Sequence, residues 1–277
     1  MTESAMQRSE EAATASGGSA LDEVAVVVHG EVGGDASDYA RHRLATLLTH
    51  VPEPVLFVRV KLTQAPDPAR ERPAHAQVTV DINGDLIRAH VAAPSMTEAV
   101  DLVRARLQDQ LEHRHERQQS RHRQPDASAP GEWRHGDRPT HRPDHYDRPP
   151  DERELVQHKT YVVDDLRPDE AAFDLEQLDF DFYLFRDVTT GEESLIERDG
   201  AGAYRLTGLH HHVVDRGPSA VDLVVSEQTP PEWTVEQAID ALGADGGRFV
   251  FFADAETHRG TVLYLRYDGH YGLIAPE

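Results

Sequence analysis

Apolar and polar residues alternate along residues 24–117 in a pattern that predicts one small mixed domain. Alternating or β-branched runs mark four strands, at 24–29, 55–63, 76–82 and 86–91. The last two flank Asn83-Gly84, a strong hairpin signal. Apolar residues three and four positions apart mark helices at 36–49 and from 96 to about 117. The order βαβββα predicts an open sheet with two helices on one face.

The C-terminal half contains one pattern twice. Over 25 positions from Phe182, a shift of 67 residues gives seven identities: Phe182/Phe249, Phe185/Phe252, Asp187/Asp254, Thr190/Thr257, Gly202/Gly269, Tyr204/Tyr271 and Leu206/Leu273. Each copy has the pattern of a short helix followed by a hairpin and a closing turn. The chain is therefore predicted to be α+β, with two tandem small β-rich domains (helix plus hairpin) at 154–208 and 209–277 after the first domain at 24–117.

Two stretches have no helix or strand pattern. Residues 1–23 have the composition of a disordered tail, and the Pro-, Arg- and His-rich residues 118–153 that of a linker. The net charge of −22 is concentrated in residues 151–277, which carry 27 acidic and 10 basic side chains, whereas residues 24–123 carry 13 of each. A neutral domain can present a basic face, so the total charge does not exclude a nucleic-acid partner.

Several classes of function have no support in the sequence. There is no cysteine, and the three consecutive histidines at 210–212 cannot all point toward one ion, so we expect neither a metal nor a cofactor. No nucleophile–base pattern marks an enzyme. No apolar run approaches the roughly 20 residues of a membrane span, and no signal peptide is recognisable, so we expect a cytoplasmic protein without a membrane partner.

Basic side chains of the first domain are the candidates for RNA contact, because phosphates need a positive, hydrogen-bonding surface. They are Arg41, Arg43, Arg59, Lys61, Arg88, Arg104, Arg106, Arg114 and Arg117. The residues alone also fit an ordinary solvated polar face. An acidic protein–protein scaffold without RNA binding is therefore the alternative function.

Two stretches carry a family resemblance: FVFFADAETHRGTVLYLRYDGHYGLIAPE at the C-terminus and SMTEAVDLVRARLQDQL in the second predicted helix. Both resemble the long bacterial ribosome hibernation-promoting factors. The resemblance extends over 24–117 and 158–277. It implies a first domain that binds the small ribosomal subunit in the mRNA/tRNA channel and blocks translation during stress or dormancy. Glu31, Asp109 and Glu112 depart from the family pattern by placing acids where basic residues are usual.

In that family the C-terminal domain forms a small sheet that pairs with a second copy of itself. This chain carries two copies, so we expect them to pair within one molecule and to silence single ribosomes. A homodimer that joins two ribosomes is the alternative. The expected interface residues are Phe182, Phe185, Phe249, Phe251, Phe252, Tyr264 and Tyr271. We also expect Gly272 to hold a positive φ that Arg205, its counterpart in copy 1, would not adopt cheaply.

Overall fold

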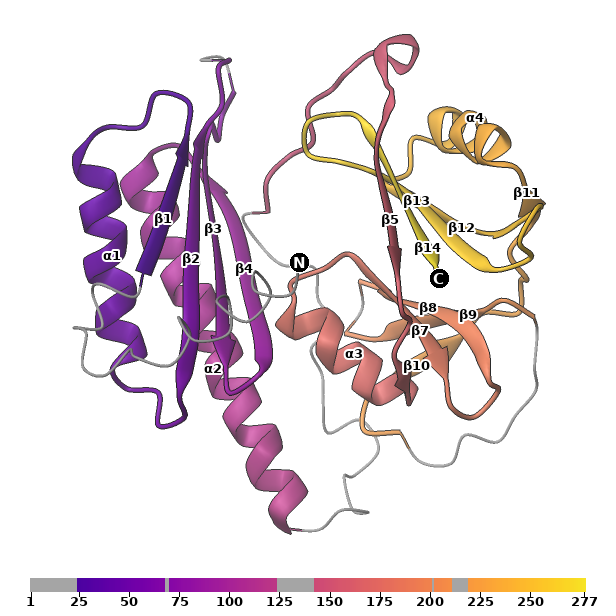
Figure 1. Ribbon diagram of the computed structural model, residues 1–277, viewed down its shortest axis with the longest axis horizontal. Coiled ribbons are helices and arrows are strands. Elements are labelled where there is room, and N and C mark those ends of the chain that lie inside the picture. The colour runs from indigo at the N-terminus through magenta and orange to yellow at the C-terminus, as the bar shows by residue number, and fades with distance from the viewer. Residues whose placement is uncertain (1–23, 68–69, 124–141, 201, 211–218) are drawn as a thin grey trace, which may run out of the picture. The chain divides into compact units, whose positions relative to one another are not determined.

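The computed structural model describes residues 24–67, 70–123, 142–200, 202–210 and 219–277, and the predicted tail at 1–23 lies outside them. The chain divides into two compact units, Met1–Asp109 and Gln110–Glu277. Figure 1 shows the elements of each unit.

Four strands form the sheet of the first unit, in the order β1-β2-β3-β4. They are β1 (Val24–His29), β2 (Val55–Gln64), β3 (Ala74–Ile82) and β4 (Asp85–Ala93). β1 is parallel to β2, and the other neighbours are antiparallel. Asn83 and Gly84 form the β3–β4 turn with φ of 56° and 98°, in the left-handed region that Asn and Gly adopt most readily.

Helices α1 (Asp35–Leu48) and α2 (Met96–Arg123) cover one face of this sheet (Figure 1). Their buried stripes include Leu44 and Leu107, and the strands contribute alternate buried residues such as Val60. The predicted βαβββα domain with both helices on one face is confirmed. α2 continues past residue 117 into the predicted linker, because no proline or glycine interrupts the chain before Arg123.

The second unit contains two five-stranded sheets built on one plan, in the orders β10-β9-β8-β7-β6 and β11-β12-β13-β14-β5. The first sheet consists of β6 (Asp165–Leu166), β7 (Phe182–Asp187), β8 (Glu192–Arg198), β9 (Tyr204–Gly208) and β10 (Leu223–Val225). The second consists of β5 (Leu155–Tyr161), β11 (Glu232–Trp233), β12 (Phe249–Asp254), β13 (Gly260–Leu265) and β14 (Tyr271–Pro276). One helix accompanies each sheet, α3 (Pro168–Gln177) and α4 (Val235–Asp245).

Each copy gives its first strand to the sheet of the other copy. β5 is the first strand of copy 1 but pairs in parallel with β14 of copy 2, and β10 is the first strand of copy 2 but pairs in parallel with β9 of copy 1. Gln157 lies opposite Gly272, and Val224 lies opposite Arg205, so a shift of 67 residues relates the two pairings. Neither sheet is complete with residues from one copy alone.

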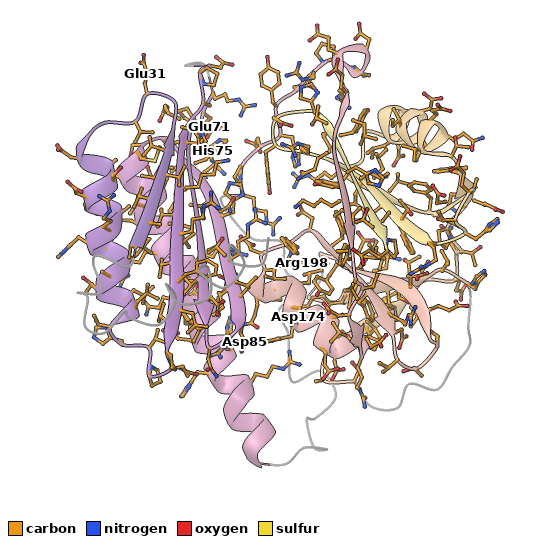
Figure 2. All side chains as sticks on the ribbon, viewed as in Figure 1. Glu31, Glu71, His75, Asp85, Asp174 and Arg198 are labelled. Carbon is orange, nitrogen blue, oxygen red and sulfur yellow. The ribbon has the colours of Figure 1, made fainter. Side chains whose placement is uncertain are left out.

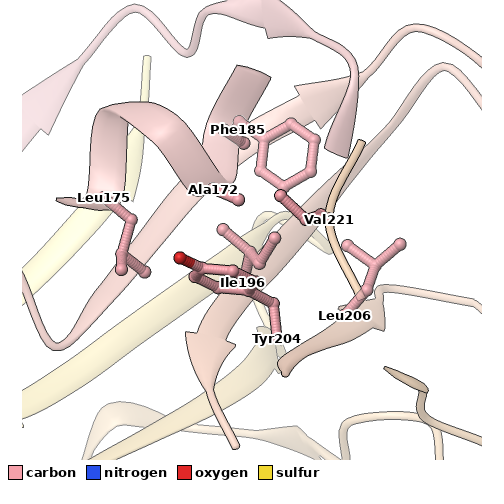
Figure 3. Close-up of a cluster of buried hydrophobic side chains, with 8 residues drawn as sticks. Ala172, Leu175, Phe185, Ile196, Tyr204, Leu206 and Val221 are labelled. Atoms are coloured by element: carbon pink, nitrogen blue, oxygen red, sulfur yellow. The ribbon is translucent and has the colours of Figure 1, made fainter. Parts of the chain in front are cut away.

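Alternation along the strands divides the apolar side chains among three clusters. In the first, α3 packs on its sheet through Ala172 and Leu175, which meet Phe185, Ile196 and Tyr204 (Figure 3). A second cluster joins α4 to the other sheet in the same way. The third joins the two sheets face to face and consists of Leu184, Leu195, Leu209, Phe251 and Val262. The layers of this unit are therefore helix, sheet, sheet, helix.

The end of the predicted linker packs onto the second unit. Residues 142–153, here called the strap, include a short 3₁₀ helix at Pro150–Glu152. The backbone amide of Tyr146 donates a hydrogen bond to the carbonyl of Tyr267 at 3.0 Å. A Cβ on Gly269 would lie 2.7 Å from the carbonyl oxygen of Tyr146, so glycine is required there for the strap to approach. The strap belongs to the second unit, whereas the prediction placed it in the linker.

Candidate nucleic-acid interface and pairing surface

Three candidate cations share the helix-free face of the first sheet. Arg59 and Lys61 alternate along β2 with the buried Val58, Val60 and Leu62, so their side chains leave the sheet on the side away from the core. Thr79 of β3 lies opposite both Arg59 and Arg88, which places the two arginines on the same face. Arg88 donates a hydrogen bond to Gln77 at 3.2 Å.

Arg59 and Lys61 are the most available of the candidates. Both residues are exposed, and neither has a side-chain hydrogen bond or ion pair within the part of the chain that the structure describes. Three acids of this unit, Glu31, Glu71 and Asp85, lie at the ends of the strands (Figure 2). Arg59, Lys61 and Arg88 therefore lie along the middle of the helix-free face, with Asp81 of β3 two residues beyond Thr79 on the same face.

The α1 candidates are held by acids. Arg41 pairs with Asp38 at 2.8 Å on the exposed surface. Arg43 contacts Asp101 of α2 through Nε at 2.9 Å and Nη2 at 2.7 Å, and the Tyr39 hydroxyl donates to the same carboxylate. Hydrogen bonding to Asp101 raises the pKa of both Arg43 and Tyr39. Arg43 therefore ties α1 to α2, a role that sequence reasoning missed because its partner is distant in the chain.

The four candidate arginines on α2 do not form one surface. Arg104 and Arg106 are partly exposed and two positions apart, so they leave the helix in different directions. Arg114 is buried, with 5% of its surface exposed, and the Arg117 guanidinium lies 3.7 Å from the ring centre of Phe173. Arg114 and Arg117 belong to the second unit by their contacts. The structure brings together Arg59, Lys61 and Arg88, but not the whole predicted set.

Four of the expected interface aromatics lie between the two sheets. The rings of Phe182 and Phe249 are 4.6 Å apart, and those of Phe182 and Tyr264 are 5.9 Å apart. Phe251 belongs to the cluster that joins the sheets. The Tyr161 hydroxyl, from the exchanged strand β5, donates to the carbonyl of Leu184 at 2.8 Å.

The other three expected interface aromatics lie elsewhere. Phe185 packs under α3, and Phe252 and Tyr271 pack under α4, each inside the core of one layer. The reason is the two-residue period of a strand, which sends Phe182 and Phe185 to opposite faces. Treating each aromatic run as a single cluster overlooked that period.

The structure also corrects the expectation for Gly272. Among the described residues, the glycines with positive φ do not include Gly272. A Cβ at Gly272 would lie 2.5 Å from the ring of Tyr264, so the glycine makes room for an aromatic side chain. Copy 1 has Glu197 at the position of Tyr264, which leaves space for Arg205.

An ion pair joins the copies and was not predicted. Arg259 Nε lies 2.7 Å from Glu193 Oε1, and the Glu193 side chain is only 7% exposed. The Arg259 Nη1 also donates to the carbonyl of Glu277 at 3.0 Å. The alignment of the two copies could have indicated this ion pair. It matches Glu192-Glu193 of copy 1 with Arg259-Gly260 of copy 2, so the charge is reversed at matched positions.

Arg142 fastens the strap to copy 1. Its guanidinium pairs with Asp179 at 2.8 Å and Asp181 at 2.6 Å, and it donates to the carbonyls of Asp179 and Phe180. The side chains of Arg142 and Asp179 are 8% and 0% exposed. A buried charge is tolerated only when paired, so this contact fixes the strap.

His145 fastens the strap to copy 2. Its ring stacks on Tyr267 with 4.7 Å between centres. Burial lowers the pKa of His145 below its ordinary value; the positive charges of Arg248 and Arg142 act in the same direction, and the charge of Asp181 opposes them. The neutral imidazole is therefore the form that this contact favours.

The two copies use different chemistry beneath their helices. In copy 1, Arg198 binds Glu176 with Nε–Oε1 of 2.8 Å and Nη2–Oε2 of 2.9 Å, and the Tyr204 hydroxyl donates to the same carboxylate. Figure 2 shows Arg198 beside α3. Copy 2 has Leu265 and Leu242 at the matched positions, and both belong to its apolar cluster. An ion pair therefore occupies in copy 1 the place of an apolar contact in copy 2.

The described residues contain neither a candidate membrane span nor a candidate metal cluster. No helix there is long and apolar enough to cross a membrane. No group of three or more His, Cys, Asp or Glu within that part of the chain is arranged to hold a metal ion. His211 and His212 lie outside the described residues, whereas the neighbouring His210 pairs with Glu192 at 3.0 Å.

Comparison with known proteins matches the chain to two family models. "Sigma 54 modulation protein / S30EA ribosomal protein" matches residues 25–119, and "Sigma 54 modulation/S30EA ribosomal protein C terminus" matches residues 150–206 and 224–273. Two curated relatives, from Mycobacterium tuberculosis strains CDC 1551 / Oshkosh and ATCC 25618 / H37Rv, are each named "Dormancy associated translation inhibitor". Each is 35% identical over 134 residues, which is 46% of this chain and 49% of the relative. The chain thus spans about half the length of the curated relatives that it matches.

Two solved structures are also similar to part of the chain. The Thermus thermophilus Protein Y N-terminal domain is 22% identical with a TM-score of 0.28, covering 33% of this chain and 97% of that one. A ribosomal subunit interface protein from Coxiella burnetii is 14% identical with a TM-score of 0.29, covering 33% and 96%. The two family models together match well over half of the residues, one over the first unit and the other over both C-terminal copies. The chain belongs to the Sigma 54 modulation/S30EA ribosomal protein family.

Proposed function

We propose that this protein is a ribosome hibernation factor that binds the small ribosomal subunit in the mRNA/tRNA channel and blocks translation by occupying it. The observation that carries the proposal is the set of Arg59, Lys61 and Arg88 on one helix-free sheet face, within the region that matches the S30EA ribosomal protein model. Cations on such a face can contact successive phosphates of an RNA backbone. The mechanism is occupancy, and it requires no covalent chemistry.

Arg59 and Lys61 are the residues with which to test RNA contact. The variant Arg59→Glu/Lys61→Glu is expected to bind ribosomes at least 100-fold more weakly, because two lost charged hydrogen bonds, at about 1.5–3 kcal/mol each, amount to about 3–6 kcal/mol. The slope of log affinity against log salt should fall by about two, one for each lost phosphate contact. Co-sedimentation with ribosomes at several salt concentrations measures both quantities.

The matched control is Lys159→Glu/Arg186→Glu, which makes the same charge change at exposed positions of the second unit. It should bind like the wild type. Equal weakening in both variants would assign the effect to net charge and reject the proposed face. A wild-type chain that does not sediment with ribosomes at all would favour the acidic scaffold as the function.

We further propose that the two C-terminal copies pair within one chain, so that single ribosomes are silenced. The aromatic contacts between the sheets and the reciprocal strand exchange support this pairing. The short connection from β9 to β10 gives each copy a high effective concentration near the other, on the order of millimolar. Sedimentation equilibrium of the full chain should give the monomer mass of 30.9 kDa. A stable dimer at micromolar concentration, with ribosomes sedimenting in pairs, would instead support the homodimer.

A further inference from the structure

Matched residues of the two copies touch each other at the centre of the pairing surface. Phe182 and Phe249, which the 67-residue shift relates, pack against each other with their ring centres 4.6 Å apart and their planes tilted by 45°. Glu193 and Gly260 are related by the same shift, and the Gly260 amide lies 3.5 Å from Glu193 Oε2. A residue that contacts its own counterpart lies beside the approximate two-fold axis that relates the copies. These two pairs therefore mark that axis.

The copies differ in charge beside this axis. Copy 1 presents Glu192 and Glu193, whereas copy 2 presents Arg259 and Gly260. The Arg259 guanidinium covers the nearly buried Glu193 carboxylate at 2.7 Å. The outer partners are also reversed, since Arg259 donates to the Glu277 carbonyl while Glu192 accepts from His210 or pairs with it.

The copies also differ in side-chain volume there. A Cβ on Gly260 would lie 2.9 Å from Glu193 Cβ and 2.9 Å from Phe251 Cε2, so the glycine leaves the space that both neighbours use. Copy 1 has the smaller Leu184 at the position of Phe251 and Glu193 at the position of Gly260. Copy 2 thus combines the large Phe251 with Gly260, whereas copy 1 combines the smaller Leu184 with Glu193.

We infer that the axis residues are a specificity element that allows copy 1 to pair only with copy 2. A pair of two copies 1 would bring together two Glu193 carboxylates at a nearly buried position with no Arg259 to neutralise them. A pair of two copies 2 would leave the Glu193 volume empty and set two Arg259 guanidiniums near each other without that acid. This inference rests on the proposed intramolecular pairing and adds the reason why the chain does not pair like copies between molecules.

The test uses the full purified chain without ribosomes, so its result is separate from the test of ribosome binding. Gly260→Glu places an acid against Glu193. It should lower amide-exchange protection of β7 and β12 at least tenfold, and it should reduce the melting temperature of the second unit. Gly243→Glu is the control with the same substitution, since its added Cβ would meet no atom closer than 3.6 Å; it should keep wild-type protection.

Two further variants separate specificity from a general failure to fold. Exchanging the axis residues between copies (Leu184→Phe, Glu192→Arg, Glu193→Gly, Phe251→Leu, Arg259→Glu, Gly260→Glu) should restore protection and the monomer mass. Giving both copies the residues of copy 2 (Leu184→Phe, Glu192→Arg, Glu193→Gly) should again lose protection, although glutamate has been removed. Wild-type protection in Gly260→Glu or in this last variant would overturn the inference, and so would an exchange variant no better protected than Gly260→Glu.

Discussion

Replacing Arg142 with methionine would remove the guanidinium that holds the strap while keeping much of the side-chain volume. The Asp179 side chain, which is 0% exposed, would lose this ion-pair partner. Removing one partner of a buried ion pair costs about 3–5 kcal/mol. For a unit of this size each kcal/mol lowers the melting temperature by about 2–4 °C, so the transition of the second unit should fall by roughly 6–20 °C.

Thermal unfolding of the full chain, followed by circular dichroism and calorimetry, measures this shift. The control is Arg186→Met, whose ion pair with Asp165 is 3.8 Å long and exposed, and which should cost less than about 1 kcal/mol. Adding Asp179→Asn to Arg142→Met should recover part of the loss, because the buried charge is then removed. A loss below about 1 kcal/mol in Arg142→Met would show that the strap is a tether with no part in the stability of the unit.

Three other changes have definite expected outcomes. The double variant Glu176→Leu/Arg198→Leu copies the apolar contact of copy 2. It should leave the free energy of unfolding unchanged or raise it by about 1–4 kcal/mol in urea denaturation. Either single change should lower that free energy by about 3–5 kcal/mol. The pKa of His145 is lower in the folded protein than in the unfolded chain. The stabilisation that the neutral His145 side chain provides is therefore complete above the unfolded-state pKa of about 6.5, and it is lost as pH falls through the folded-state pKa. His145→Phe should therefore reduce the slope of the urea midpoint against pH in that acidic range, and an unchanged slope would exclude this role. Gly272→Ala should destabilise the unit by about 1–3 kcal/mol, because the new Cβ meets the Tyr264 ring; a wild-type melting temperature would contradict that geometry.

The fold of the first unit was predictable because local sequence patterns specify its strands, helices and turn. Each strand buries one face, so alternation identifies it, and Asn83-Gly84 specifies the turn that joins two of them. The alternation of Arg59 and Lys61 likewise placed both on one sheet face. Arg43 was less predictable, because the acid that holds it is 58 residues away and nothing in the local sequence marks that pairing.

The second unit depended on contacts that no local pattern reveals. β10 has only three residues, and the sequence does not state which copy β5 or β10 completes. The strap is held by an ion pair and a ring stack instead of an apolar stripe, so its composition is that of a linker. The duplication itself can be recognised in the sequence, but the pairing of matched positions across an axis is visible only in the three-dimensional structure.

The reciprocal strand exchange has a consequence for synthesis on the ribosome. Glu154, beside β5, contacts His270, beside β14, across 116 residues of chain. At about 5–20 residues per second, β5 leaves the ribosome roughly 6–23 s before its partner strand exists. During that interval Leu155 and Val156 belong to a strand without its neighbour, and copy 1 lacks β10 until that segment follows. We therefore expect the two sheets of the second unit to be completed only after copy 2 is made, and a nascent chain stalled within copy 2 to expose an unpaired strand edge to other chains.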